Sequence, residues 1–390
     1  MISVSDAQQK LLGLVSVLGI EDVPLAQSTG RILAQSVQAR RDQPPFSASA
    51  MDGYAVKSAE VERHAMFKVV GEAAAGHRYS AAVSAGQAVR IFTGAPLPQG
   101  TDFVVIQEDV TRKGDVITIA NDPGAGTNIR PAAGDFSQGQ PLLAPGRLSA
   151  AQIALLAAMN VPLVPVRRRP EIALISTGDE LVMPGETPGP DQIVASNTFG
   201  LKALLQAEGA RVRILPIARD NAASLRTAFD LAKGADLVVT IGGASVGDHD
   251  LVAPVAQELG MERAFYKVAM RPGKPLMAGG LMGMAMVGLP GNPVSAMVCG
   301  HIFLLPMVRR MLGISPETAM FHTARLLAPL AQNGPRAHYM RARVSKEGIE
   351  TFANQDSSLL SVLAQSNALL LRPPHDAAQQ IGEEVSYLPI

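Results

Sequence analysis

The chain has 390 residues, 47% of them hydrophobic, and its 34 basic and 34 acidic residues cancel. This length favours two to four domains, while the absence of net charge, the 4% aromatic content and the lack of tryptophan argue against a nucleic-acid groove with stacking platforms. A single cysteine, Cys299, excludes an internal disulfide and, with seven scattered histidines, leaves no cluster for structural zinc.

The first 168 residues predict one helix and then β-rich structure. Helix-like sequence covers residues 3–18, and glycines and prolines recur at short intervals between Pro44 and Leu143. Asp52 and Thr93 each sit beside a glycine, so we expect their side chains on exposed turns, which suggests a surface for a partner. The strands expected in this part are residues 67–70, 89–92, 103–107 and 116–119.

From about Glu171 strand and helix patterns alternate along the chain. This βαβ repetition predicts a doubly wound, mostly parallel α/β sheet, whose ligands bind outside the carboxyl ends of the strands. The expected strands are residues 172–176, 212–217, 237–241, 265–270 and 285–288, and the expected helices are residues 197–208, 222–232, 251–259 and 294–312.

The tail after about Ser315 has weak β patterns at residues 342–344, 369–371 and 385–388, which suggest a C-terminal β-domain. The expected fold is therefore multi-domain, α/β plus β. Its parts are an N-terminal helix, which must pack on some domain that need not be its sequence neighbour, a β-rich inserted domain (44–139), the α/β domain (169–315) and the C-terminal β-domain (316–390).

The longest apolar stretch, residues 294–308, contains Gly300, His301 and Pro306. We expect it to be too short and too interrupted to span a bilayer, and the N-terminus has no basic segment before its apolar residues. A soluble cytoplasmic protein without membrane or nucleic-acid partners is the expectation.

A β-branched run at residues 237–241 ends in Gly242 and Gly243, followed by Ser245, Asp248 and Asp250. Glycines let backbone N–H groups approach a phosphate, and the helix expected after them points its positive N-terminus the same way. Two carboxylates beside a phosphate repel it unless a divalent cation lies between them, so the segment implies Mg²⁺ and a phosphorylated substrate. The alternative is a tight strand-to-helix turn.

The segment Ser176–Leu181 places Asp179 and Glu180 directly after the first strand of the α/β part. Because the strand ends converge and Mg²⁺ needs only one or two carboxylates, Glu180 and Asp250 are a sufficient pair of ligands. Taken alone, the same segment also fits a surface turn.

Two further segments fit an anionic ligand. Lys267, Arg271 and Lys274 surround a Pro-Gly turn and can gather three cations on one anionic group. The rigid loop 288–295, with Pro290 and Asn292, enters a helix and suits the presentation of N–H groups to phosphate. Each alone could be ordinary turn chemistry, and neither a Walker loop nor a dinucleotide fingerprint is present.

Six motifs occur together and in order: Met51–Val56, Thr93–Pro96, Ser176–Leu181, Gly242–Gly247, Arg271–Pro275 and Gly288–Pro293. In this combination the chain resembles the MoeA-type molybdopterin molybdenumtransferases and the E-domains of gephyrin and its plant counterpart. The resemblance implies a molybdopterin-binding type of α/β domain in a four-domain, L-shaped homodimer. In this arrangement an N-terminal helix (1–20) packs on the α/β domain, and residues 21–43 and 140–168 form a linker and dimerisation domain. It also implies insertion of molybdate into adenylylated molybdopterin with Mg²⁺, which releases AMP and molybdenum cofactor.

The resemblance also implies roles for individual residues. Asp52 and Thr93 would reach the α/β domain of the other subunit, and Arg341 and Ser357 would lie near the molybdate. Arg271, Lys274 and the two glycine loops, Ser245 included, would bind substrate, and the adenylyltransferase of the same pathway is a possible partner. The residues assigned to the active-site region are Asp52, Thr93, Arg130, Asp135, Glu180, Asp220, Asp250 and Lys267.

The chain departs from the family pattern at several places. Arg271 stands where many relatives carry lysine, Ala195 precedes Ser196 and Asn197 without the usual acidic residue, and residues 131–133 replace a more basic run. The element Arg336–Arg341 resembles an Arg-x-acidic-Phe-x-Arg pattern, with His338 at the acidic position. Arginine keeps the charge of lysine and changes the hydrogen-bond geometry.

Three alternative functions remain open at this level. Residues 243–247 also fit the Gly-x-Ser-x-Gly elbow of a serine hydrolase with Ser245 as nucleophile, although residues 247–250 separate it from its helix. The α/β part resembles molybdopterin adenylyltransferases, which share the glycine-serine loop and lack the β-rich inserts. A non-catalytic dimeric scaffold is the third alternative, since the gephyrin E-domain also clusters receptors.

Overall fold

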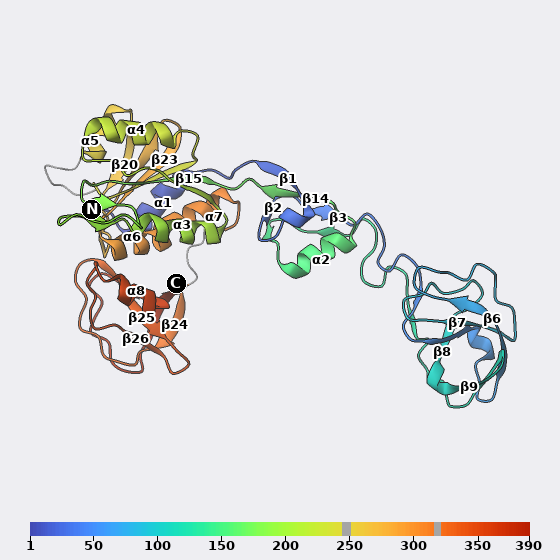
Figure 1. Cartoon of the computed structure of the whole chain (residues 1–390). Helices are drawn as coiled ribbons and strands as arrows, with labels where there is room; N and C mark the ends of the chain where they lie inside the picture. Colours follow the sequence, from blue (N-terminus) through green and yellow to red (C-terminus); the bar gives the residue numbers. More distant parts are fainter. Residues whose placement is uncertain (244–250, 316–320) are drawn as a thin grey trace. The chain divides into compact units, whose positions relative to one another are not determined.

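The computed structural model describes residues 1–243, 251–315 and 321–390. The chain forms two compact units, one made of Met1–Glu21 with Arg167–Ile390 and the other of Asp22–Val166. Figure 1 shows the elements of both units along the chain. The predicted residues Ser245 and Asp250 lie outside the described residues.

A six-stranded sheet forms the centre of the first unit, in the order β18-β15-β19-β23-β22-β20. β15 pairs in parallel with β18 and β19, and β19 pairs in parallel with β23, while β22 runs antiparallel between β23 and β20. The predicted mostly parallel α/β sheet is therefore confirmed. The strands are β15 (Glu171–Ser176), β18 (Arg211–Ile214), β19 (Leu237–Ile241), β20 (Glu262–Tyr266), β22 (Met277–Leu281) and β23 (Met284–Leu289).

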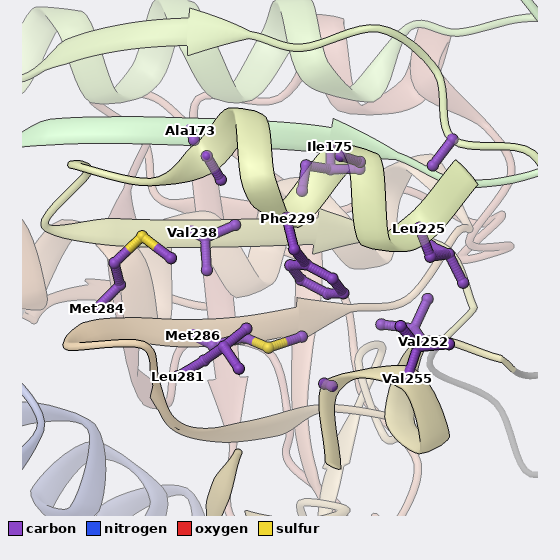
Figure 2. Close-up of a cluster of buried hydrophobic side chains, with 14 of the residues drawn as sticks. Ala173, Ile175, Leu225, Phe229, Val238, Val252, Val255, Leu281, Met284 and Met286 are labelled. Carbon is purple, nitrogen blue, oxygen red and sulfur yellow. The ribbon is translucent and has the colours of Figure 1, made fainter. Parts of the chain in front are cut away.

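Helices cover both faces of this sheet (Figure 1). On one face α4 (Ala222–Ala232) and α5 (Val252–Glu258) pack on the strands, and Figure 2 shows Phe229 among Val238, Val252 and Met286. On the other face lie α1 (Val4–Gly13), α3 (Asn197–Glu208), α6 (Pro293–Cys299) and α7 (Leu305–Met311). Predicted and observed bounds agree for α3 and α4, whereas the N-terminal helix ends well before residue 18.

A π-helical turn, η4 (Gly300–Leu304), joins α6 and α7 into one continuous helix. Pro306 has no N–H to donate to the Ile302 carbonyl, and Gln8 Nε2 of α1 donates to that oxygen instead at 3.0 Å. Among the described residues this helix, Pro293–Met311, is 19 residues long and apolar enough to cross a membrane by length and composition. The helix is longer than the apolar stretch 294–308 noted in the sequence, and 72% of its apolar window is buried inside the structure, as in a core helix.

A second sheet in this unit contains the C-terminal strands, in the order β21-β25-β27-β28-β24 with β26 on β25. The predicted strand 265–270 was wrong, because β20 ends at Tyr266 and β21 begins at Met270 in this other sheet. Lys267 between them has a left-handed φ of 67°, which ends the strand at a position where the sequence has neither glycine nor proline. The elements are β21 (Met270–Arg271), β24 (His322–Arg325), β25 (Ala337–Val344), β26 (Ile349–Thr351), α8 (Leu360–Gln365), β27 (Ala368–Arg372) and β28 (Glu384–Pro389).

The second unit contains a six-stranded sheet in the order β8-β5-β7-β6-β10-β9. β5 is buried on both faces, because Tyr54 and Val56 belong to one hydrophobic cluster and Ala55 to another. Sequence patterns missed β5 and β9, since both are short and lack alternation. The strands are β5 (Gly53–Val56), β6 (Met66–Ala73), β7 (Gln87–Ile91), β8 (Phe103–Ile106), β9 (Val110–Lys113) and β10 (Val116–Ile119).

The remaining elements of the second unit are small. A four-stranded sheet in the order β1-β14-β2-β13 packs with one helix around Leu33, Leu156 and Val164. Two-stranded ladders join β3 with β12 and β4 with β11. These elements are β1 (Ile20–Pro24), β2 (Ile32–Leu33), β3 (Val37–Gln38), β4 (Ala48–Ser49), β11 (Ile129–Arg130), β12 (Pro141–Leu142), β13 (Gly146–Arg147), α2 (Ala150–Ala158) and β14 (Leu163–Arg167).

Candidate functional site

A cavity of about 720 Å³ opens at the carboxyl edge of the α/β sheet. Register pairs Ser176 with Ile241 and Ile241 with Leu289, so β15, β19 and β23 end at one level and their following loops start side by side. The cavity therefore forms at the edge of the sheet where the sequence predicted ligand binding. Six of the predicted site residues line it: Glu180, Asp220, Gly242, Gly243, Pro290 and Asn292.

The loop that presents Glu180 is held by a residue that sequence reasoning missed. Arg219 Nη1 donates to the carbonyl oxygens of Asp179 at 3.0 Å and of Leu181 at 3.3 Å, on either side of Glu180. The Asp220 N–H donates to Asp179 Oδ1 at 3.2 Å, which ties the two acidic loops together. Arg219 precedes Asp220 in the sequence, and a basic residue next to a predicted acidic one was the only local signal.

Gly178 provides the space that the Glu180 carboxylate occupies. Its φ is 146°, and a Cβ built on it would lie 2.3 Å from Glu180 Oε2 and 2.7 Å from Cδ. Only glycine therefore allows the carboxylate to fold back over this loop.

Gly178→Ala is expected to lower turnover about tenfold or more, because its Cβ displaces the Glu180 carboxylate and a misplaced group of this kind can cost up to about a hundredfold. Gly185→Ala is the matched control, since Gly185 also has a positive φ of 96° but has nothing within 4 Å of its Cβ position. Steady-state kinetics of both variants test this. Equal loss in both would assign the effect to backbone strain and contradict the collision.

The two glycine loops are closely packed around the cavity. A Cβ on Gly242 would lie 2.7 Å from the Thr177 carbonyl oxygen, and one on Gly243 would lie 2.5 Å from Val252 Cγ2. The N–H of Gly242 donates to the Leu289 carbonyl at 3.1 Å, so this donor is already used within the fold. The glycines therefore permit close packing of the loops and give the cavity its floor.

The loop with Pro290 and Asn292 is anchored from two directions. Asn197 Nδ2 donates to the Gly291 carbonyl at 2.8 Å, and Asn292 Nδ2 donates to Ser357 Oγ at 3.1 Å. Ser357 also accepts the Val294 N–H through its carbonyl at 3.0 Å. The structure thus brings Ser357 of the C-terminal region to the rim of the cavity.

One wall of the cavity is aliphatic. β16 (Leu181–Val182) pairs in parallel with β17 (Ile193–Val194), and Ile193 and Val194 are 60% and 42% exposed. Ala195, at the position without the usual acidic residue, lines the same wall. The lining of the site therefore combines carboxylates with an apolar surface.

The predicted basic turn contributes little to the cavity lining. Pro275 lines the cavity, but Lys267, Arg271 and Lys274 are not among the described residues that do so. Lys267 Nζ lies over the ring of Tyr266, 5.0 Å from its centroid, and Arg271 is exposed on β21. The three cations surround one turn, but no direct contact with the cavity is seen in the described part of the chain.

Arg341 is almost completely buried, with 1% exposure. Its Nε donates to Gln355 Oε1 at 3.1 Å and its Nη1 to the Asp356 carbonyl at 2.6 Å, and burial lowers the pKa of its guanidinium. Its predicted neighbour Ser357 follows Asp356 directly, so Arg341 fixes the backbone that carries Ser357.

His338 lies directly opposite Arg271 across the β21–β25 ladder, so two of the departures from the family pattern meet. Burial, and the positive charges of Arg271, Arg341, Arg372 and Arg336, lower the pKa of His338 to about 4. His338 is therefore neutral at pH 7 within a group of arginines. Sequence reasoning saw these residues separately and missed the cluster.

The other predicted site residues lie in the second unit. Asp52 Oδ1 accepts the N–H and the hydroxyl of Thr93, both at 2.8 Å. These two bonds, with a smaller effect of the Arg90 charge, lower the pKa of Asp52. Thr93 is exposed, as predicted, and Asp52 is half-buried.

Arg130 and the turn after Thr93 flank the same short strand. Arg130 pairs with Ala48 in the β4–β11 ladder, and Ser49 of β4 accepts the Gly94 N–H at 2.9 Å. Asp135 is exposed and its N–H donates to the Gln43 carbonyl at 2.9 Å. The unit therefore gathers Thr93 and Arg130 around β4.

The predicted metal ligand Asp250 and the predicted nucleophile Ser245 lie outside the described residues. Within the described ranges no group of three or more His, Cys, Asp or Glu side chains could hold a metal ion. Glu180 and Asp220 are the carboxylates that the described part contributes to the cavity.

Three family models match successive parts of the chain. They are described as the MoeA N-terminal region (domain I and II) over residues 2–160, a probable molybdopterin binding domain over residues 173–310 and the MoeA C-terminal region (domain IV) over residues 323–390. Together they cover both units.

Curated relatives and a solved structure agree with these matches. A molybdopterin molybdenumtransferase of Nostoc sp. is 36% identical over 100% of this chain and 94% of its own, and one of Haemophilus influenzae is 32% identical over 100% and 98%. The crystal structure of the molybdopterin biosynthesis MoeA protein from Pyrococcus horikoshii has a TM-score of 0.85 at 29% identity and covers 100% of this chain. The chain belongs to the molybdopterin molybdenumtransferase family, and it is a transferase of molybdenum cofactor biosynthesis.

Proposed function

We propose that the chain inserts molybdate into adenylylated molybdopterin with Mg²⁺ and releases AMP together with molybdenum cofactor. The observation that carries this proposal is the cavity at the ends of β15, β19 and β23, which Glu180 and Asp220 line together with two glycine loops. Purified protein supplied with adenylylated molybdopterin, Mg²⁺ and molybdate should release AMP, and the release should require molybdate.

The donor set of the cavity fits Mg²⁺. This ion takes one or two carboxylates and completes its shell with water and phosphate oxygens, so Glu180 with Asp220 or Asp250 is sufficient. The Glu180 carboxylate occupies the space that a Cβ on residue 178 would fill, which is available because this residue is glycine. When bound, the cation would offset the repulsion between these carboxylates and a pyrophosphate and polarise the phosphoryl oxygens.

The shape and polarity of the cavity support a ligand with a flat ring and a phosphate group. Ile193 and Val194 give an aliphatic surface on which a pterin or adenine ring can pack, and the Gly291–Asn292 loop opposite is held by Asn197 and Ser357. Because these loops are already fixed by hydrogen bonds, binding costs little reorganisation. Pro290 and Asn292 then orient the phosphate end of the substrate.

The basic residues outside the cavity lining would supply the charge that a pyrophosphate and a molybdate dianion need. We assign Lys267, Arg271 and Lys274 to this role, and Arg130 from the second unit. Arg341 and Ser357 would bind near the molybdate, with Arg341 acting through the backbone that it holds. A cytoplasmic location and a contact with the adenylyltransferase of the same pathway complete the proposal.

We also propose a homodimer in which Asp52, Thr93 and Asp135 of one subunit act at the α/β cavity of the other. Asp52→Ala and Glu180→Ala subunits should each retain only a small residual rate alone, and their mixture should regain part of the activity, because one site of each mixed dimer is intact. Size-exclusion chromatography with AMP-release assays tests this, with each variant remixed with itself as the control. A mixture as inactive as its parents would rule out shared sites.

A further inference from the structure

Arg90 of β7 lies between two aromatic rings in the second unit. Its Cζ is 5.1 Å from the centroid of Tyr54, its direct partner on β5, and 4.7 Å from the centroid of Phe92. A guanidinium over an aromatic face is attracted by the ring quadrupole. Stacking on two rings therefore fixes the plane of this side chain.

The same guanidinium donates two hydrogen bonds beside Asp52. Nη1 donates to the Gly53 carbonyl at 3.1 Å, and Nη2 donates to Gln107 Oε1 at 2.6 Å. The Gln107 N–H in turn donates to the carbonyl of Asp52 at 3.0 Å. Arg90 thus holds the residue after Asp52 directly and Asp52 itself through Gln107.

Arg90 also reaches the other half of the Asp52–Thr93 pair, because Phe92 directly precedes Thr93. The strand that carries Gly53 lies close to β8, since a Cβ on Gly53 would lie only 2.0 Å from the Val105 carbonyl oxygen. One side chain therefore links both sides of the pair to a closely packed strand.

The pair itself leaves one carboxylate oxygen available. Asp52 Oδ1 accepts both bonds from Thr93, and Oδ2 accepts none from the residues that the structure describes. Among those residues, Arg90 contributes a positive charge beside this carboxylate. The direction of Oδ2 is thus set by the Thr93 turn and by the backbone that Arg90 holds.

We infer that Arg90 is a positioning residue of the reaction, which orients Asp52 Oδ2 for its work at the site. This inference rests on the proposed function, because it requires that Asp52 acts in turnover. If Arg90 served stability alone, loss of its ring contacts and its two hydrogen bonds would have the same effect on kcat with or without Asp52.

The test is a double-variant cycle in the full-length protein. Arg90→Met removes the positive charge and the two hydrogen bonds of the guanidinium. We expect kcat for AMP release to fall about ten- to hundredfold with less change in KM, because displacement of a catalytic group lowers the rate by factors of this size. Arg90→Lys keeps the cation over the rings without the planar fork and should recover only part of the rate. Arg112→Met is the matched control and should leave kcat unchanged, since Arg112 lies on the edge strand β9 and its Nε donates to the Gly114 carbonyl just after that strand.

The Asp52→Ala background separates the two roles. If Arg90 acts through Asp52, Arg90→Met should change kcat less than about twofold in that background, since coupled residues are not additive. A full additive loss, or wild-type kcat in Arg90→Met, would overturn the inference while Asp52→Ala remained impaired. Wild-type kcat in Asp52→Ala would overturn the proposed role of Asp52 and the inference with it.

Discussion

Glu180→Gln is expected to lower molybdate-dependent AMP release at least a hundredfold, while the protein folds as before. The change preserves the shape of the side chain but removes the negative charge that would bind the cation, and loss of one preorganised electrostatic group costs about a hundred- to a thousandfold in kcat. Because Glu180 lies over Gly178 in an open cavity, the amide fits the same space. Excess Mg²⁺ should restore only a small part of the rate.

Glu186→Gln is the matched control for this experiment. Glu186 follows β16, the short strand that begins directly after Glu180. Its Oε2 accepts the Met183 N–H at 2.8 Å, but it is not among the described residues that line the cavity. Turnover of Glu186→Gln should stay close to that of the wild type. Similar losses in both variants would show that the whole segment around β16, and not the Glu180 charge, supports the reaction.

Phe229→Ala is expected to destabilise the α/β part of the first unit by about 3–5 kcal/mol, the usual cost of removing a buried phenyl ring. Phe229 is fully buried between α4 and the sheet, where Figure 2 shows it among side chains of β19, β23 and α5. Because that sheet holds the three loops of the cavity at one level, activity should be lost at a lower temperature as well.

Leu231→Ala on the same helix provides the comparison. Leu231 is 47% exposed, so its truncation should change the free energy of unfolding by about 0.5 kcal/mol or less. Denaturant unfolding followed by circular dichroism measures both variants. An equal shift of the midpoint for both would contradict the assignment of Phe229 to the core.

The sequence was sufficient for β15, β19 and β23, the parallel strands whose ends carry the site, but it did not predict β22 of the same sheet. Runs such as Ile172–Ser176 and Leu237–Ile241 are β-branched, apolar and closed by turn residues, which is typical of buried parallel strands. The break at Lys267 was not predictable, because the left-handed residue there is a lysine and the run around it stays apolar. Tertiary pairing of Met270–Arg271 with β25, rather than local preference, determines where that strand lies.

The residues of the candidate site were likewise predictable only in part. Residues at strand ends, such as Glu180 and Asn292, were found because the carboxyl edge of a parallel sheet is a known place for ligands. Arg219 and Arg90 were not found, since their roles depend on hydrogen bonds to loops far along the chain. Arg90, for example, bonds with Gly53 and Gln107, 37 and 17 residues away.

The most direct test of the proposed function is AMP release measured with adenylylated molybdopterin and Mg²⁺, with and without molybdate. Wild-type protein should release AMP only when molybdate is present and should yield molybdenum cofactor in equal amount, and Glu180→Gln should do neither. Release of AMP at the same rate without molybdate, or consumption of ATP to form the adenylylated pterin instead, would contradict metal insertion as the reaction of this chain.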